Sequence, residues 1–133
     1  MTTTTQSWLE LLGWGQAELE DLRFVGFAYI KQGKYDIALT FFEALLFLSN
    51  DDPYDLQTLG ALYLQMGNNF AALNFLERAI KIAPDHHPTL LNRVKALFLL
   101  GYRNQALDQA KTLISSTNVY VSNQASALVL AYS

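Results

Sequence analysis

Glycine and alanine recur along this chain at a fixed interval of 34 residues. The matching positions are Gly33, Gly67 and Gly101, then Ala38, Ala72 and Ala106, and finally Gly26 and Gly60. Self-similarity at such a period is the signature of a repeat architecture, in which each supersecondary unit stacks on the next to bury a continuous core. The spacing therefore predicts three stacked units, which begin near Leu19, Pro53 and His87.

Each unit has the pattern of two helices joined by a glycine turn. Apolar residues follow the three-and-four spacing of a helix, and no segment alternates with the period of two that marks a strand. Gly33, Gly67 and Gly101 fall where the first helix of each unit must end, and a left-handed cap favours glycine there. Asp-Asp-Pro at 51–53 and the proline-flanked stretch 84–88 are typical of helix starts. The sequence therefore predicts an all-α fold.

Helix–turn–helix units of this length resemble the tetratricopeptide repeat. The second unit carries the most signature residues, which are Leu56, Leu59, Gly60, Tyr63, Gly67, Ala72, Leu76, Ala79 and Pro84. The first unit has Asn50 at the place of the closing proline, and the third has Arg93 and Val94 at an apolar and a glycine position. The resemblance implies three repeats in a right-handed solenoid, at 19–52, 53–86 and 87–118 of a single domain spanning 1–133.

Two flanking segments complete the chain. Residues 7–17 are expected to form a short N-terminal amphipathic helix with a bend at Gly13 and Gly15. Its apolar side consists of Trp8, Leu9, Leu12 and Trp14. Residues 119–132 are expected to form a C-terminal capping helix. Because such caps usually present a polar outer face and this segment carries no charge, we expect a partner to cover it.

Composition narrows the classes of function. Of the 133 residues, 51% are hydrophobic and 16% are charged, which excludes intrinsic disorder and leaves more apolar material than a small monomer normally hides. A net charge of −3 argues against binding to nucleic acid. The absence of cysteine excludes disulfides and thiolate chemistry. With no signal-like segment and no apolar run of membrane-spanning length, we expect a cytoplasmic protein.

Catalytic motifs are missing from the sequence. It contains no glycine-rich phosphate loop, no nucleophile elbow and no zinc-protease motif. Adjacent side chains on a helix point about 100° apart, so His86 and His87 are interpreted as turn residues rather than metal ligands. Asp51, Asp52 and Asp55 are interpreted as helix-capping acids. We therefore expect no enzymatic activity, no cofactor and no metal.

The first helix of each unit is expected to line the inner, concave wall, where tetratricopeptide arrays bind their ligands. The residues expected to form a peptide-binding groove there are Arg23, Phe24, Phe27, Ile30, Tyr54, Gln57, Ala61, Leu64, Leu91, Lys95 and Phe98, with Thr58, Gln65 and Asn92 at equivalent positions. Most of these side chains are apolar or aromatic. The predicted ligand is therefore a hydrophobic segment of a partner protein, either extended or helical.

A carboxylate clamp, the device by which some tetratricopeptide proteins grip acidic C-termini of heat-shock chaperones, is not expected. Arg23 stands at the place of one of its lysines. However, Phe27, Thr58 and Pro88 occupy other clamp positions, and Asn92 stands where an arginine belongs. The groove is therefore predicted to select apolar side chains rather than a terminal carboxylate.

The stretch 33–68 resembles the tetratricopeptide chaperones of bacterial type III secretion systems. The resemblance lies in Gly-Lys-Tyr followed by an alanine at 33–38, in the pattern Phe-x-Ala-Leu-x-x-Leu at 42–48, and in Leu-Gly-Ala-Leu-Tyr-Leu-Gln-Met-Gly at 59–67. It implies a small acidic cytoplasmic protein that keeps a hydrophobic translocator, a needle subunit or an export component soluble. The alternative that the residues leave open is a general scaffold or adaptor in a multiprotein assembly.

The same resemblance bears on self-association. In these chaperones an N-terminal helix contributes to dimer contacts. The resemblance therefore implies a possible homodimer through Trp8, Leu9, Leu12 and Trp14. Folding of this segment back onto the first unit is the other way to cover its apolar side.

Overall fold

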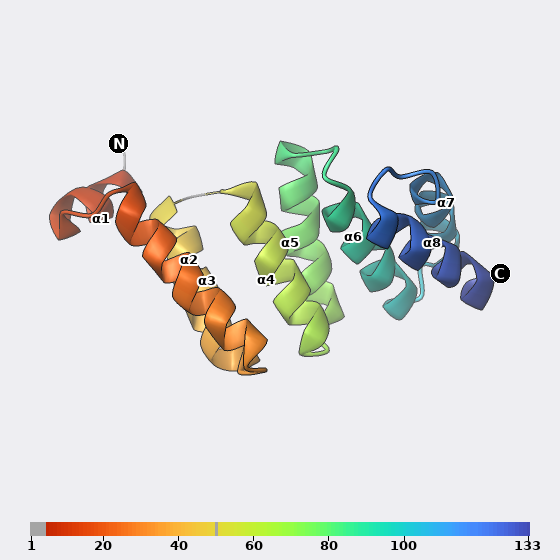
Figure 1. Cartoon of the computed structure of the whole chain (residues 1–133), viewed down its shortest axis with the longest axis horizontal. Coiled ribbons are helices and arrows are strands. Elements are labelled where there is room, and N and C mark those ends of the chain that lie inside the picture. Colours follow the sequence, from red (N-terminus) through yellow and green to blue (C-terminus); the bar gives the residue numbers. More distant parts are fainter. Residues whose placement is uncertain (1–4, 50) are drawn as a thin grey trace.

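The computed structural model describes residues 5–49 and 51–133, which form eight α-helices (Figure 1). The helices are α1 (Thr5–Leu12), α2 (Gln16–Lys31), α3 (Tyr35–Ser49), α4 (Pro53–Gln65), α5 (Asn69–Ile82), α6 (His87–Leu99), α7 (Arg103–Leu113) and α8 (Val119–Tyr132). No strand occurs in these two ranges, so the predicted all-α class is confirmed. Asn50, which replaces the closing proline of the first unit, lies outside the described residues.

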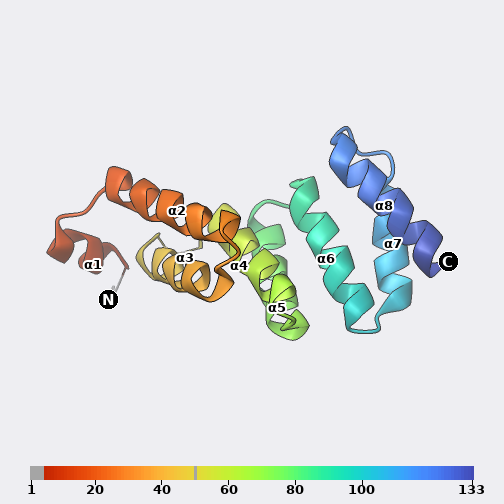
Figure 2. The same cartoon turned by 60° about the horizontal axis from the view of Figure 1, so that its bottom comes forward.

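The helices form a row of hairpins. The pairs α2–α3, α4–α5 and α6–α7 each pack as one unit, with α1 at one end of the row and α8 at the other (Figures 1 and 2). Each unit also packs on the next, through α3 with α4 and through α5 with α6. The structure is therefore a short solenoid of three helix–turn–helix units with a flanking helix at each end.

The three turns inside the units have one geometry. The backbone angle φ is +75° at Gly33, +84° at Gly67 and +90° at Gly101. In the first turn the Gly33 amide donates to the carbonyl of Ile30, and the Lys34 amide donates to the carbonyl of Tyr29, both at 2.9 Å. This pair of bonds defines the Schellman motif, in which glycine adopts the left-handed conformation at low cost. The predicted left-handed caps are confirmed.

Two other glycines allow the helices of a unit to approach closely. A Cβ atom on Gly26 would lie 2.6 Å from the Phe42 ring, and one on Gly60 would lie 2.6 Å from the Leu76 side chain. In both cases the contact is between the two helices of one unit. In the third unit the equivalent residue is Val94, which is completely buried. The third hairpin therefore packs around a side chain where the first two pack against backbone.

Two clusters of buried side chains make up much of the interior, and Leu56, Ala72, Leu76 and Ala79 are buried in α4 and α5 outside both. The first joins α2, α3 and α4 through Leu19, Ala38, Phe42, Leu45, Leu48, Leu59 and Leu62. The second joins α6, α7 and α8 through Leu91, Val94, Leu97, Phe98, Ala106, Ala110, Leu113, Val121 and Ala125. Helix α5 contributes to both, because Phe75 packs against the first cluster and Leu73 against the second.

The N-terminal segment folds back on the first unit. Helix α1 ends at Leu12, and Gly13 then turns the chain with φ +68°. The Trp14 amide donates to the carbonyl of Leu9 at 2.9 Å, and both side chains pack against the first cluster. The ring of Trp8 lies 6.0 Å from that of Phe47 on α3. Of the four residues expected to mediate self-association, Leu9 and Trp14 therefore pack against the core, and Trp8 contacts Phe47 while staying half-exposed.

The C-terminal helix covers the third unit. Helix α8 packs on α6 and α7, and its residues Val121 and Ala125 are fully buried. The ring of Tyr132 stacks on that of Phe98, with centroids 4.0 Å apart. Among the helices of the two described ranges, none combines the length and the apolar character needed to cross a membrane.

Candidate functional site: a cleft between α2 and α4

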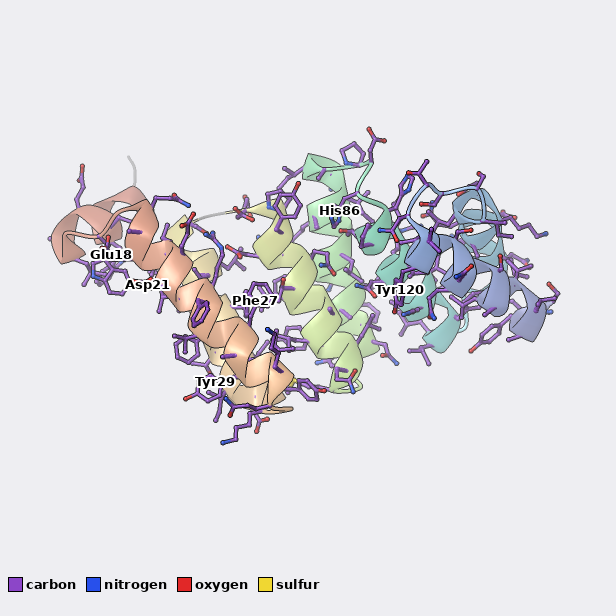
Figure 3. The ribbon with its side chains drawn as sticks, in the orientation of Figure 1. Glu18, Asp21, Phe27, Tyr29, His86 and Tyr120 are labelled. Atoms are coloured by element: carbon purple, nitrogen blue, oxygen red, sulfur yellow. The ribbon has the colours of Figure 1, made fainter. Side chains whose placement is uncertain are left out.

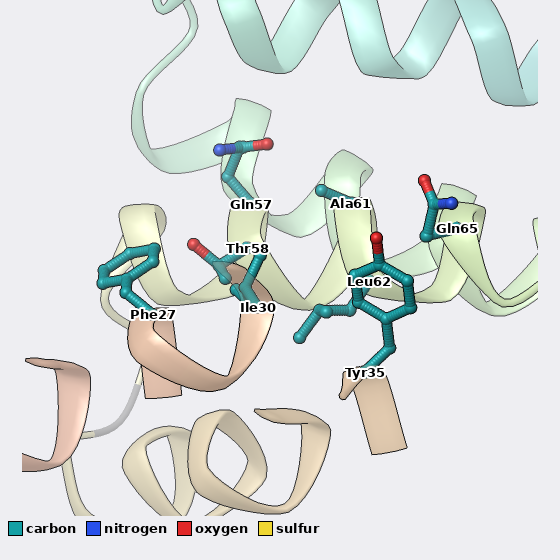
Figure 4. Close-up of a pocket in the computed structure, with 8 residues that line it drawn as sticks. All are labelled: Phe27, Ile30, Tyr35, Gln57, Thr58, Ala61, Leu62 and Gln65. Atoms are coloured by element: carbon teal, nitrogen blue, oxygen red, sulfur yellow. The ribbon is translucent and has the colours of Figure 1, made fainter. Parts of the chain in front are cut away.

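A cavity of about 300 Å³ opens between the first two hairpins (Figure 4). Its lining consists of Phe27 and Ile30 of α2, Tyr35 of α3, and Gln57, Thr58, Ala61, Leu62 and Gln65 of α4. Apolar side chains form much of this wall, and amide and hydroxyl groups interrupt it. A concave site of this kind binds apolar groups and orients them through a few polar contacts.

The cavity lies between α2 and α4, the first helices of two neighbouring units, which are farther apart than α4 and α6. Within the described part of the chain, no Cα atom of α2 comes within 8 Å of a Cα atom of α4. Helices α4 and α6 do approach to that distance, and so do α6 and α8. The first junction is therefore held on its other side, where α3 packs on α4, and stays open between α2 and α4.

Two residues of α4 shape the opening. Ala61 contributes only a methyl group to the wall, which leaves depth for a side chain from a ligand. Gln57 lies between the cleft and the next unit, and its side-chain oxygen accepts a hydrogen bond of 2.7 Å from the amide of Asn92 on α6. A hydrogen bond thus links α4 and α6 across their inner sides, whereas the space between α2 and α4 stays open as the cleft.

Arg23, one turn before Phe27 on α2, does not line the cleft and pairs with α4 instead. Its Nε and Nη2 atoms each donate to the carboxylate of Asp55 at 2.8 Å, and Asp52 lies 3.6 Å away. Asp55 is buried and also accepts a bond of 3.3 Å from the Ser49 hydroxyl. The hydrogen bond to Asp55 raises the pKa of Arg23, against the lowering effect of burial. The predicted groove role of Arg23 is therefore corrected, because its guanidinium pairs with Asp55 and links the first unit to the second.

Two acidic residues at the start of α4 have different roles. Asp52 is the N-cap, and its carboxylate accepts bonds from the backbone amides of Tyr54 and Asp55 at 2.9 and 3.1 Å. This confirms the capping role predicted for Asp52. The side chain of Asp55 instead pairs with Arg23, which the sequence interpretation did not include.

The structure brings together part of the predicted groove. Six of the expected residues line the cleft, namely Phe27, Ile30, Gln57, Thr58, Ala61 and Gln65, and Figure 3 shows Phe27 projecting from α2. The position pattern missed Tyr35 and Leu62. Tyr35 begins α3 just after the glycine turn, outside the first helices that the pattern covers. Leu62 is a buried core residue of α4, and part of its side chain also lines the cleft. The sequence pattern distinguishes core residues but does not show which of them reach the cleft.

Two expected groove residues are wrong for a physical reason. Leu91 is 2% exposed and Phe98 is 8% exposed, and both belong to the second core cluster. Helix α8 covers the inner side of α6, and Tyr132 stacks on Phe98. The apolar positions of the third unit are thus used by the C-terminal helix, and no groove surface remains at these two residues.

The other expected positions lie outside the cavity. Phe24 and Tyr54 are exposed on α2 and α4, and Tyr54 packs edge-on against the ring of His86 at 5.2 Å. Leu64 is half-buried on α4. The ammonium group of Lys95 lies 5.9 Å from the centre of the Tyr120 ring of α8. None of these residues lines the cleft.

The histidines have separate partners. Nδ1 of His86 lies 2.7 Å from the Thr89 hydroxyl, and Nδ1 of His87 lies 2.6 Å from the Ser116 hydroxyl. Figure 3 places His86 in the turn that precedes α6. Across residues 5–49 and 51–133, no three His, Asp or Glu side chains gather in a way that could hold a metal ion.

Comparison with known proteins agrees with this geometry. Residues 56–86 match the family model described as a tetratricopeptide repeat. A search of curated protein sequences gives no significant match. Many solved structures share the fold.

Three of these structures are informative. PcrH of Pseudomonas aeruginosa, solved in complex with the chaperone binding region of PopD, has a TM-score of 0.81 at 22% identity over 90% of this chain and 94% of PcrH. The Yersinia enterocolitica type III secretion translocator chaperone SycD also has a TM-score of 0.81, at 21% identity over 98% of this chain and 99% of SycD. The first TPR of Spaghetti, bound to the HSP90 peptide SRMEEVD, has a TM-score of 0.76 at 18% identity over 88% of this chain and 94% of that one. The chain therefore has the tetratricopeptide fold and resembles type III secretion chaperones in structure.

Proposed function

We propose that this protein is a non-catalytic tetratricopeptide chaperone that holds a hydrophobic segment of a partner protein in the cleft between α2 and α4. The partner is a type III secretion component, either a translocator, a needle subunit or another export component. The observation that carries the proposal is the cavity of about 300 Å³, whose apolar wall of Phe27, Ile30 and Leu62 is open to a ligand. The structural likeness to PcrH and SycD supports the choice of partner.

The physical basis is the removal of apolar surface from water. A hydrophobic secreted protein exposes apolar segments before it is exported, and such segments associate with one another. A cleft that buries even one aliphatic or aromatic side chain contributes about 1.5–3 kcal/mol to binding. Several contacts along an extended segment would bring the affinity into the micromolar range or below. In this role the protein acts in the cytoplasm, before secretion.

The ion pair between Arg23 and Asp55 favours an apolar ligand over an acidic C-terminus. A carboxylate clamp needs cationic side chains directed at the ligand, and this guanidinium already pairs with Asp55. Phe27 and Thr58, at two other clamp positions, line the cleft with a ring and a hydroxyl group. The site therefore offers little to a terminal carboxylate.

A comparison of two peptides tests the proposal. The purified protein is titrated with the chaperone binding region of PopD and, separately, with the peptide SRMEEVD, and binding is followed by calorimetry. We expect the PopD segment to bind at least tenfold more tightly than SRMEEVD, because only the former supplies apolar side chains to the cleft. Equal affinities, or a preference for SRMEEVD, would contradict an apolar cleft. Binding of neither peptide would favour the scaffold alternative.

A further inference from the structure

Exposed apolar side chains gather at the turns of the second and third units. One turn has Met66 and Phe70 on either side of its glycine, and the other has Leu99 and Tyr102. These four side chains are between 43% and 64% exposed. Figures 1 and 2 both show the turn between α4 and α5 and the turn between α6 and α7 on the lower edge of the row. We call these four residues the turn edge.

The repeat itself does not require apolar residues at these positions. Leu99 is equivalent to Lys31 of the first unit, and Tyr102 is equivalent to Lys34, in each case at twice the 34-residue period. The first unit forms the same glycine turn with lysine at both places. The fold therefore does not explain the apolar side chains of the turn edge, and a contiguous exposed group of this kind indicates an interaction surface.

The turn edge is uncharged, whereas the opposite end of α4 is not. No charged residue occurs in the stretches 63–76 and 96–102. At the start of α4, by contrast, the carboxylates of Asp52 and Asp55 lie beside the guanidinium of Arg23. An apolar chain that covers charged groups removes them from water at a cost in free energy. An apolar ligand is therefore favoured at the turn edge and disfavoured at the start of α4.

The turn edge is continuous with the cleft between α2 and α4. Gln65 is the last residue of α4 and lines the cleft, and Met66 follows it directly. Figure 4 shows Gln65 beside Tyr35, at the opposite end of the lining from Phe27. Leu99 is the equivalent of Gln65 on α6, so it lies at the same level of the next first helix. The cleft thus opens at Gln65 onto an apolar surface.

The inner side of the third unit does not offer an alternative path. The amide of Asn92 on α6 donates to Gln57 at 2.7 Å and links α4 to α6. Helix α8 packs on α6, where Leu91 is buried and the Tyr132 ring stacks on Phe98. A ligand that fills the cleft therefore meets closed packing along the middle of α6 and exposed apolar side chains at the turns.

We propose that the hydrophobic partner segment, here called the client, leaves the cleft past Gln65 and continues over the turn edge. Met66, Phe70, Leu99 and Tyr102 then contact apolar side chains of the client. The proposal rests on the client-binding function proposed above. It adds the direction in which the client runs, and it requires that the residues next to the cleft-bound part of the client be apolar and uncharged.

The distance to be covered is short. Neighbouring packed helices lie about 10 Å apart, and an extended chain advances about 3.3 Å per residue. About three residues beyond the cleft are therefore enough to reach the next first helix at the level of Leu99.

Leu99 and Leu130 provide a matched pair of variants. Both are exposed leucines near the end of a helix, at 58% and 82%, and Leu130 lies on α8 at the far end of the row. Glutamine at either position should leave far-UV circular dichroism and the melting temperature unchanged. Calorimetry then measures binding of the chaperone binding region of PopD. We expect Leu99→Gln to bind at least fivefold more weakly than the wild type, because an apolar contact is lost, and Leu130→Gln to bind within twofold of it.

The absence of cysteine allows the path of the client to be followed directly. A single cysteine is introduced by Gln65→Cys, Phe70→Cys, Leu99→Cys or Leu130→Cys and is labelled with a fluorophore whose emission shifts to the blue in apolar surroundings. Each labelled protein is saturated with the PopD segment. We expect a blue shift at positions 65, 70 and 99 and no shift at position 130.

The results distinguish this proposal from the client-binding function. A shift at position 65 without one at positions 70 and 99 would overturn the path over the turn edge and leave binding in the cleft intact. Equal affinities of Leu99→Gln and Leu130→Gln would overturn the path as well. If the wild type does not bind the PopD segment in calorimetry, both proposals fail together.

Discussion

Arg23 and Asp55 join the first two units through two parallel hydrogen bonds of 2.8 Å between a guanidinium and a carboxylate. They are 32 residues apart in the chain, and they span the junction at which α2 and α4 keep their backbones apart. Asp55 is buried while Arg23 keeps a fifth of its side chain in contact with solvent. The pair therefore fixes the separation of α2 and α4 at one end of the cleft.

Removing one partner of this pair should cost more than removing both. Asp55→Asn leaves the Arg23 guanidinium without its carboxylate, and we expect a loss of roughly 2–4 kcal/mol in the free energy of unfolding. The double variant Arg23→Met, Asp55→Leu should recover at least half of that loss, because no unpaired charge stays buried. Urea unfolding of the wild type, of Arg23→Met, of Asp55→Leu and of the double variant measures the coupling energy of the pair. Additive losses would mean that the two side chains do not interact in solution.

Gly60 should not tolerate a side chain. A Cβ atom there would lie 2.6 Å from Leu76 and 3.3 Å from the carbonyl oxygen of Ala72, so Gly60→Ala should lower the stability by roughly 1–3 kcal/mol and Gly60→Leu by more. Thermal unfolding measures both variants. The control is Gly15→Ser at the N-cap of α2, where a Cβ meets only Glu18 at 3.8 Å. Serine is a favourable N-cap, so the melting temperature should stay or rise. An unchanged melting temperature in Gly60→Leu would contradict the close packing of α4 on α5.

Filling the cleft should block client binding without damage to the fold. Ala61 lines the cavity with a methyl group, so Ala61→Leu adds volume where a client side chain would enter. We expect at least a tenfold loss of affinity for the chaperone binding region of PopD by calorimetry, with an unchanged melting temperature. Ala44→Leu is the matched control, because Ala44 is exposed on α3 and does not line the cavity. Equal affinities of the two variants would place the binding site elsewhere.

Tyr63 should make stability sensitive to alkaline pH. Burial raises the pKa of Tyr63, and the hydrogen bond of its hydroxyl to Glu43, 3.1 Å long, raises it further. The folded protein thus holds this proton more tightly than the unfolded chain does, whose tyrosines titrate near pH 10. This contribution to stability is complete below about pH 10 and is lost as the pH rises through the raised pKa.

The variant Tyr63→Phe isolates this effect. It keeps the ring that stacks on Phe75 at 5.5 Å and removes only the ionisable hydroxyl. The difference in urea stability between wild type and variant should be constant from about pH 7 to pH 9 and should shrink above about pH 10. A difference that does not change with pH would show that the Tyr63 proton is held equally in both states.

The sequence predicted the features that depend on local spacing. The glycines of the turns need a positive φ, and that requirement is visible in the chain as Gly33, Gly67 and Gly101. The close contacts of Gly26 and Gly60 are equally local, because the partner helix follows after a fixed turn. Such features repeat with the unit, and a period of 34 residues is enough to locate them.

The candidate site was only partly predictable, because contacts that do not repeat from unit to unit decide which residues line it. Phe98 has the position of a groove residue, yet the terminal helix brings Tyr132 onto its ring. Arg23 also has a groove position, and its role is decided by an acid in the following unit. Neither contact recurs in the other units, so periodicity gives no sign of them. The wide spacing of α2 and α4, which creates the cleft, likewise has no marker in the spacing of residues.

The presence of two buried clusters has a consequence for folding cooperativity. Only α5 belongs to both, with Phe75 directed to one cluster and Leu73 to the other. In a linear array each unit is stabilised by its immediate neighbours, so the stretch α6–α8 can open while α1–α4 remain folded. Amide hydrogen exchange in the native state would then reveal two sets of protected amides with different opening free energies, and α5 would follow the more stable set.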